Sequence, residues 1–212
     1  MRTILTGGLV LSLGLAGCAQ RALTLPTDPI DQAATCGVVA AASEREAAGA
    51  KGDLPADAQA RILHYAMLYA STGKAFDQDK LNAVSKRMPQ LFDQTIKGKW
   101  KSLQSTCVVA FPASQIRQPA LPPKPLDAML QCDALAEFLR KALADQGSNY
   151  GEAANAYGLF IEKLDPKLSP ALRAAGSGGA DALRDRKLEA LASASKLGQP
   201  PAVIDACEKK YS

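Results

Sequence analysis

Residues 125–143, PLDAMLQCDALAEFLRKAL, carry the clearest helical pattern in the chain. Pro125 is well suited to the first turn of a helix, where its missing N–H costs nothing. One face is apolar at helical spacing and the opposite face is charged; the apolar face holds Cys132, Leu135, Ala136, Leu139 and Leu143, and the charged face holds Asp133, Glu137, Arg140 and Lys141. The stretch predicts an amphipathic helix that directs Cys132 toward a core.

Cys132 belongs to a set of four cysteines that form two similarly spaced pairs. Cys36 and Cys107 are 71 residues apart (107 − 36), and Cys132 and Cys207 are 75 apart (207 − 132). Each pair has one cysteine near the start of a helical block and one near its end. Four cysteines allow three pairings, and the repeat selects Cys36–Cys107 and Cys132–Cys207.

The patterns around these cysteines predict four helices in each copy. In residues 31–112 we expect a helix capped by Asp31, one beginning near Pro55, one from Asp77 with a kink or break at Pro89, and a short last helix with Cys107. In residues 126–212 we expect the helix above, then Gly151 to Lys163 with Pro166 and Pro170 beyond its end, Asp181 to Lys196, and a last helix with Cys207.

The predicted fold class is therefore all-α, with two disulfide-closed helical-bundle repeats. Residues 113–125 are rich in proline and predict a stiff spacer between the repeats. The repeats form either two bodies or one continuous helical body. Apolar residues make up 47% of the chain but aromatic residues only 5%, so the core is thin and covalent bonds between helices would stabilise it.

The N-terminus indicates export. A basic Arg2 and an apolar stretch, too short to span a bilayer, precede Leu15-Ala16-Gly17-Cys18. This boundary resembles the lipobox of bacterial lipoproteins. The resemblance implies that residues 1–17 are a signal peptide and that Cys18 carries lipid. Residues 18–30 contain Pro26 and Pro29 and lack helical periodicity, so we expect them to form a tether. Ala19 in place of Asp implies the outer membrane of a Gram-negative host, facing the periplasm, with the inner membrane or cell surface left open. The oxidising periplasm suits disulfides.

Other chemistry finds little support in the sequence. The formal net charge of +4 is too small to indicate nucleic acid binding. No CxxC or CxxCH spacing supports zinc or haem, so we expect neither a metal nor a cofactor. His64, the only histidine, falls away from the apolar stripe of its helix and is expected on the surface. Two SxxK matches lack the SDN and KTG elements of penicillin-binding enzymes.

The most unusual local composition is the turn formed by Lys97, Gly98, Lys99, Trp100 and Lys101. It predicts either a contact point for an anionic envelope component or a surface turn with Trp100 tucked into the bundle. The leading function hypothesis is a non-enzymatic envelope lipoprotein with a structural or protein-interaction role. The alternatives are a binding module for an anionic envelope ligand and an unrecognised hydrolase.

Overall fold

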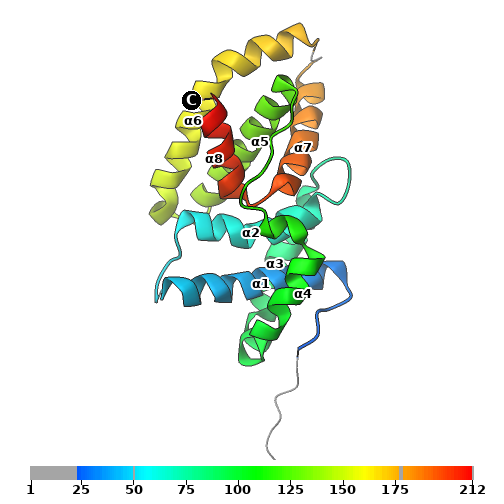
Figure 1. Cartoon of the computed structure of the whole chain (residues 1–212), viewed down its shortest axis with the longest axis vertical. Helices are drawn as coiled ribbons and strands as arrows, with labels where there is room; N and C mark the ends of the chain where they lie inside the picture. The colour runs from blue at the N-terminus through cyan, green and yellow to red at the C-terminus, as the bar shows by residue number, and fades with distance from the viewer. Residues whose placement is uncertain (1–22, 50, 177–178, 212) are drawn as a thin grey trace, which may run out of the picture.

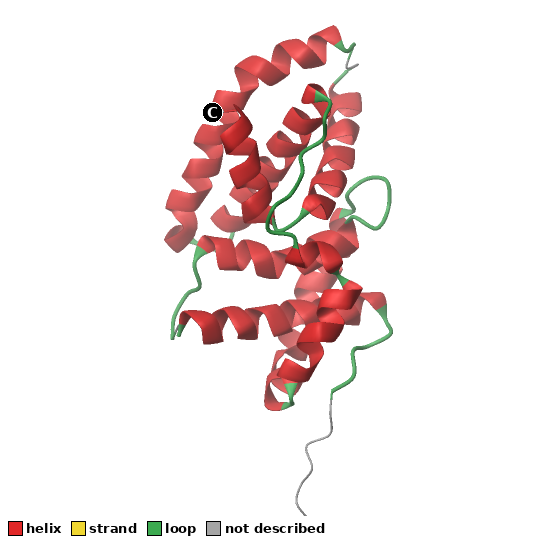
Figure 2. Cartoon of the chain, viewed as in Figure 1, coloured by secondary structure: helices red, strands yellow, loops and turns green. Residues whose placement is uncertain are grey.

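The computed structural model describes residues 23–49, 51–176 and 179–211, and this part of the chain contains α-helices and short 3₁₀ turns but no strand (Figure 1). Figure 2 shows the helices joined by loops of varied length. The predicted all-α class is confirmed. The helices are α1 (Pro29–Ala48), α2 (Ala56–Ala70), α3 (Gln78–Lys97), α4 (Gln104–Ala110), α5 (Pro125–Ala144), α6 (Gly151–Ala174), α7 (Ala180–Leu197) and α8 (Pro200–Tyr211).

Both predicted disulfides are present. Cys36 of α1 bonds Cys107 of α4, with Cα atoms 5.5 Å apart. Cys132 of α5 bonds Cys207 of α8, with Cα atoms 5.8 Å apart. All four cysteines are buried. Each bond joins the first helix of its half to the last.

The two halves follow the same plan. Pro29–Ala48 and Pro125–Ala144 are displaced by 96 residues at both ends (125 − 29 and 144 − 48). The third helices, α3 and α7, end 100 residues apart (197 − 97), and a glycine follows each of them. The first helix contacts the other three helices of its half in both cases.

The halves pack as one body around a shared core. One cluster of buried apolar residues contains side chains from α1, α2 and α3 together with side chains from α5 to α8. Hydrogen bonds also cross between the halves: the N–H of Phe76 donates to the Leu188 carbonyl at 3.0 Å, and the Tyr150 hydroxyl donates to the Leu54 carbonyl at 3.0 Å.

The proline-rich connection does not act as a spacer. Its first residues form a 3₁₀ turn (Pro112–Gln115), and the connection is held to α8 by Gln199. The Gln199 N–H donates to the Ile116 carbonyl at 2.9 Å, and its side-chain amide donates to the Ser114 carbonyl at 2.8 Å. Leu121 packs against the shared core. The connection is therefore docked on the body, which agrees with the alternative of one continuous helical body.

Three prolines lie inside helices, where a kink or break was expected at Pro89 and the end of a helix was expected before Pro166 and Pro170. Helix α3 continues through Pro89, and α6 continues through Pro166 and Pro170. Proline inside a helix costs about 3 kcal/mol. In α6 the leucines at 164, 168 and 172 are buried on one face, and each contributes about 2 kcal/mol by leaving water. This burial offsets the cost of the prolines and extends α6 beyond Lys163.

The chain before α1 lies against the body. Asp28, not Asp31, caps α1: its carboxylate accepts from the N–H groups of residues 30 and 31. Asp31 instead accepts from the Arg87 guanidinium at 2.6 Å. Leu23 and Leu25 are half-buried on a second apolar cluster formed around Cys36 and Cys107. The described part of the expected tether is therefore docked.

Candidate functional site

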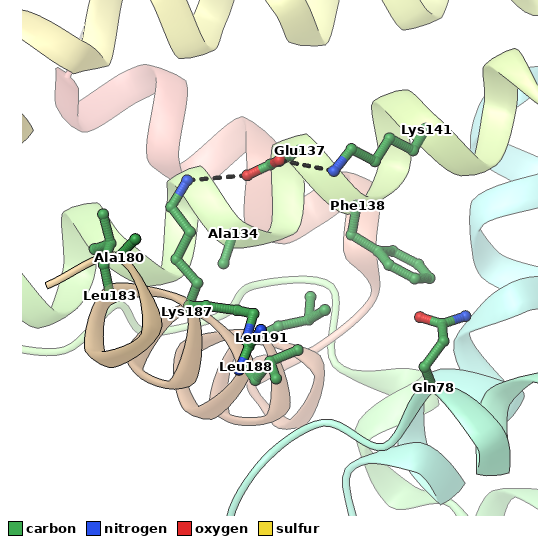
Figure 3. A pocket seen from close by; sticks show the side chains of 11 residues that line it. Gln78, Ala134, Glu137, Phe138, Lys141, Ala180, Leu183, Lys187, Leu188 and Leu191 are labelled. Carbon is green, nitrogen blue, oxygen red and sulfur yellow. Dashed lines mark hydrogen bonds and ion pairs between the residues drawn. The ribbon is translucent and has the colours of Figure 1, made fainter.

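A groove runs along α5 and α7 and has a volume of about 430 Å³ (Figure 3). Its lining is mostly apolar and comes from both helices: Ala134, Phe138, Ala180, Leu183, Leu188 and Leu191. Gln78, at the start of α3, lies near Phe138 at one end. A concave apolar surface with a few polar groups at its edge is the usual form of a binding site.

The edge of the groove carries a chain of ion pairs. Lys187 of α7 lies 2.9 Å from a carboxylate oxygen of Glu137 on α5, and Lys141 lies 2.8 Å from the other oxygen. Figure 3 shows Glu137 between the two ammonium groups. The sequence-predicted Glu137–Lys141 pair is present. These bonds fix the charged edge of the groove across two helices.

Asp133 is the buried end of this network, which corrects its expected place on a charged surface. It is only 5% exposed, and its carboxylate lies 2.8 Å from the Lys187 ammonium. Burial raises the pKa of Asp133, and the bond to Lys187 opposes this rise. The reason is that α7 covers this side of α5, so the helix is buried over more than its apolar stripe.

Glu137 and Lys187 remain charged near neutral pH. The hydrogen bond from Lys141 and the bond from Lys187 outweigh desolvation and lower the pKa of Glu137 to about 2. Burial acts to lower the pKa of Lys187, but its bonds to Asp133 and Glu137 more than offset burial and raise it. Glu137 and Lys187 are paired with each other, and this pair fixes the position of the groove edge.

Arg184 is the cation at the groove that is least engaged. Its guanidinium lies 3.6 Å from Asp181 and 3.8 Å from Asp185, and its side chain is 69% exposed. Exposed pairs at such distances contribute little. The ion pairs of Arg184 therefore hold its side chain less firmly than the shorter pairs hold Lys141 and Lys187.

His64 is buried, which corrects its expected surface position. It has no exposed area, and its Nε2 lies 2.7 Å from the Ser195 carbonyl of α7. Because a carbonyl only accepts, Nε2 carries the proton. Desolvation lowers the pKa of His64 to about 4, although the Ser195 bond acts to raise it. His64 is a structural tie between the halves and does not line the groove.

The predicted basic turn lies elsewhere, between α3 and α4. Lys97 pairs with Asp93 at 3.1 Å, and Lys101 pairs with Glu46. Trp100 is half-buried against the second apolar cluster. None of Lys97, Lys99, Trp100 and Lys101 lines the groove. The sequence hypothesis of ligand binding at this turn stays a prediction.

The predicted lipidation residue, Cys18, lies outside the described residues. Within the described part of the chain, no helix is both long and apolar enough to span a bilayer. The same residues contain no cluster of three or more histidine, cysteine, aspartate or glutamate side chains suited to a metal ion.

Sequence reasoning missed the groove, although a signal for it was present. Phe138 extends the apolar surface of α5 beyond its main stripe, and Leu183, Leu188 and Leu191 make α7 partly apolar.

Comparison with protein families, with curated proteins and with solved structures found no match. The assignment of a function therefore depends on the geometry of this chain.

Proposed function

We propose that the protein is a lipid-anchored lipoprotein of the cell envelope whose helical body binds a protein partner through the groove between α5 and α7. The groove carries the partner part of this proposal. Leu183, Leu188 and Phe138 are only half-buried, whereas most of the leucines in the described part of α5 to α8 are buried in the core. Such a contiguous apolar surface with a polar border is typical of an interaction site.

The chemistry of the groove indicates what the partner presents. Apolar side chains of the partner would fill the space between the two helices, in the manner of a helix laid into a hydrophobic groove. A carboxylate of the partner would bind Arg184, because its pairs with Asp181 and Asp185 are longer than the pairs that Lys141 and Lys187 make with Glu137. The expected partner segment is amphipathic and acidic.

The anchor part of the proposal rests on Leu15-Ala16-Gly17-Cys18. Acyl chains at Cys18 would hold the body at a membrane, because two or more chains bind far more firmly than one. Mass spectrometry of the mature protein tests it: we expect a new N-terminus at Cys18 with the mass of attached lipid. An unmodified N-terminus at another residue contradicts the anchor.

Quantitative affinity purification from the native envelope tests the partner. We expect Leu183→Gln and Arg184→Glu each to reduce at least one protein that co-purifies with the wild type. Leu159→Gln is the matched control, because Leu159 is 58% exposed and lies on α6 outside the groove. Identical sets of co-purifying proteins from all four forms would contradict binding at the groove.

A further inference from the structure

The point where the N-terminal segment leaves the body lies beside the basic turn. A Cβ atom on Gly98 would lie 2.6 Å from Cδ1 of Leu23, so the two residues are in direct contact. Leu23 and Trp100 also pack against the same apolar cluster. Figure 1 shows the described N-terminal segment ending at the same end of the molecule as the turn between α3 and α4.

The chain length between this point and the lipidated residue is short. Cys18 precedes Leu23 by five residues (23 − 18). A chain of this length reaches about 17 Å at most. If Cys18 is anchored, Leu23 is therefore held within about that distance of the bilayer surface, and the turn that contacts Leu23 lies close to it.

The composition of this end suits an anionic bilayer. We define the basal face as Leu23, Lys97, Lys99, Trp100 and Lys101. Three lysines lie here with two carboxylates, those of Asp93 and Glu46. Tryptophan is enriched at membrane interfaces because its ring is apolar with one polar N–H.

We infer that the basal face rests on the anionic surface of the bilayer that holds the acyl chains. This inference rests on the anchoring in the proposed function. The anchor supplies a high local concentration of lipid headgroups, so a weak contact is sufficient. The contact would fix the orientation of the body and direct the α5–α8 half, with its groove, away from the membrane.

Trp100 is the only tryptophan in the chain, so its fluorescence reports on the basal face. The test uses the full mature lipoprotein in vesicles of phosphatidylglycerol and phosphatidylcholine that contain a lipid with a spin-labelled headgroup. We expect the spin label to quench Trp100. Quenching should fall in vesicles of phosphatidylcholine alone, and also in about 1 M salt, where the Debye length shrinks to about 3 Å.

Lysine variants separate electrostatic docking from simple proximity. Each lysine near an anionic surface shifts the ratio of docked to undocked body by up to about fivefold. We expect the loss of Lys99 to reduce docking most, because Lys97 and Lys101 are already paired with carboxylates. The triple change to glutamine at 97, 99 and 101 should reduce quenching, whereas the same change at Lys163, Lys209 and Lys210, on α6 and α8, should not.

The outcomes distinguish this inference from the anchor. An acylated protein whose Trp100 is not quenched overturns the inference and leaves the anchor in place. Quenching that ignores salt, lipid charge and the basal lysines overturns it as well. A protein with no lipid mass overturns the anchor itself, which mass spectrometry of the same sample shows before any fluorescence is measured.

Discussion

Gly198 lies directly against the backbone of Ile116: a Cβ atom on this glycine would be 2.6 Å from the Ile116 carbonyl oxygen. Gly98 occupies the corresponding place in the first half, where a Cβ would be 2.6 Å from the Leu23 side chain. In each half, the segment leading into the first helix crosses the glycine that follows the third helix. Each half thus has a crossing of this kind as well as its own disulfide.

The two glycines should respond differently to alanine. At Gly198 the obstacle is backbone, and the adjacent Gln199 N–H donates to the same Ile116 carbonyl. We expect Gly198→Ala to lower the free energy of unfolding by about 3 kcal/mol through strain and the loss of this bond. At Gly98 the Leu23 side chain can rotate away, so Gly98→Ala should cost about 1 kcal/mol. Urea denaturation of both variants measures the difference, and equal losses would contradict it.

Cleavage of the connection between the halves should not separate them under native conditions. The shared core and the cross-half hydrogen bonds remain after a cut among residues 116–124. We expect protease-nicked protein to elute as one species in gel filtration. Without reductant, denaturant should then release two fragments, each with one internal disulfide. Fragments that separate before denaturation would contradict the single body.

Each disulfide should stabilise the fold through the loop it closes. The loops span 71 and 75 residues, for which chain entropy gives about 4 kcal/mol each. We expect replacement of either cysteine pair by alanine to lower the urea midpoint, and the decrease should be similar for the two pairs. A large loss for one pair and none for the other would show that the two halves do not depend on their disulfides in the same way.

His64 should make the protein acid-sensitive below neutral pH. Its folded-state pKa of about 4 lies below the ordinary 6.5. The unfolded chain therefore takes up the proton first, so stability is full above pH 6.5 and falls as the pH drops toward 4. Between pH 7 and pH 5 the loss should be about 2 kcal/mol.

A glutamine in place of His64 tests this origin. The amide can still donate to the Ser195 carbonyl but does not titrate. Urea unfolding at pH 7 and pH 5 should show the drop in the wild type and not in His64→Gln, even if the variant is less stable at both values. A variant that keeps the full drop would contradict the assignment to His64.

The covalent frame was predictable from sequence because cysteines carry their own signal, and helical periodicity located most of the helices. Burial by neighbouring helices was not predictable in the same way. Helix α2 has two buried faces: Tyr65 packs in the second cluster, Ala60 and Met67 pack in the shared core, and His64 bonds Ser195 of the other half. The spacing of Ala60, His64, Met67 and Ser71 indicates a second stripe, but its polar members conceal it.

The same physical reason explains the errors at Asp133 and at the end of α6. A residue that is polar, or that breaks helices in isolation, takes the environment which the rest of the fold provides. Asp133 is buried because Lys187 of α7 neutralises it, and α6 continues past Pro166 because its leucine face is buried. Both depend on a partner helix distant in sequence, whose position local patterns do not specify.

The Asp133–Lys187 pair should be costly to break from one side. Lys187→Met leaves a carboxylate that is 7% exposed without its cation, and removal of one partner from a buried pair costs about 3 kcal/mol. Lys141→Met is the matched control, because that lysine is 62% exposed and contacts only Glu137 in this network. Loss of such a surface pair should cost about 0.5 kcal/mol.

Removal of both charges completes the test. In Asp133→Leu with Lys187→Met no buried charge is left unpaired, and replacement of a buried pair by apolar side chains is often neutral or stabilising. We therefore expect the double variant to recover most of the stability that Lys187→Met loses, so that the two changes are strongly non-additive in a double-mutant cycle. Urea denaturation at pH 7 gives all four free energies. Additive losses, or a Lys187→Met cost no larger than that of Lys141→Met, would show that the pair is not a coupled buried interaction.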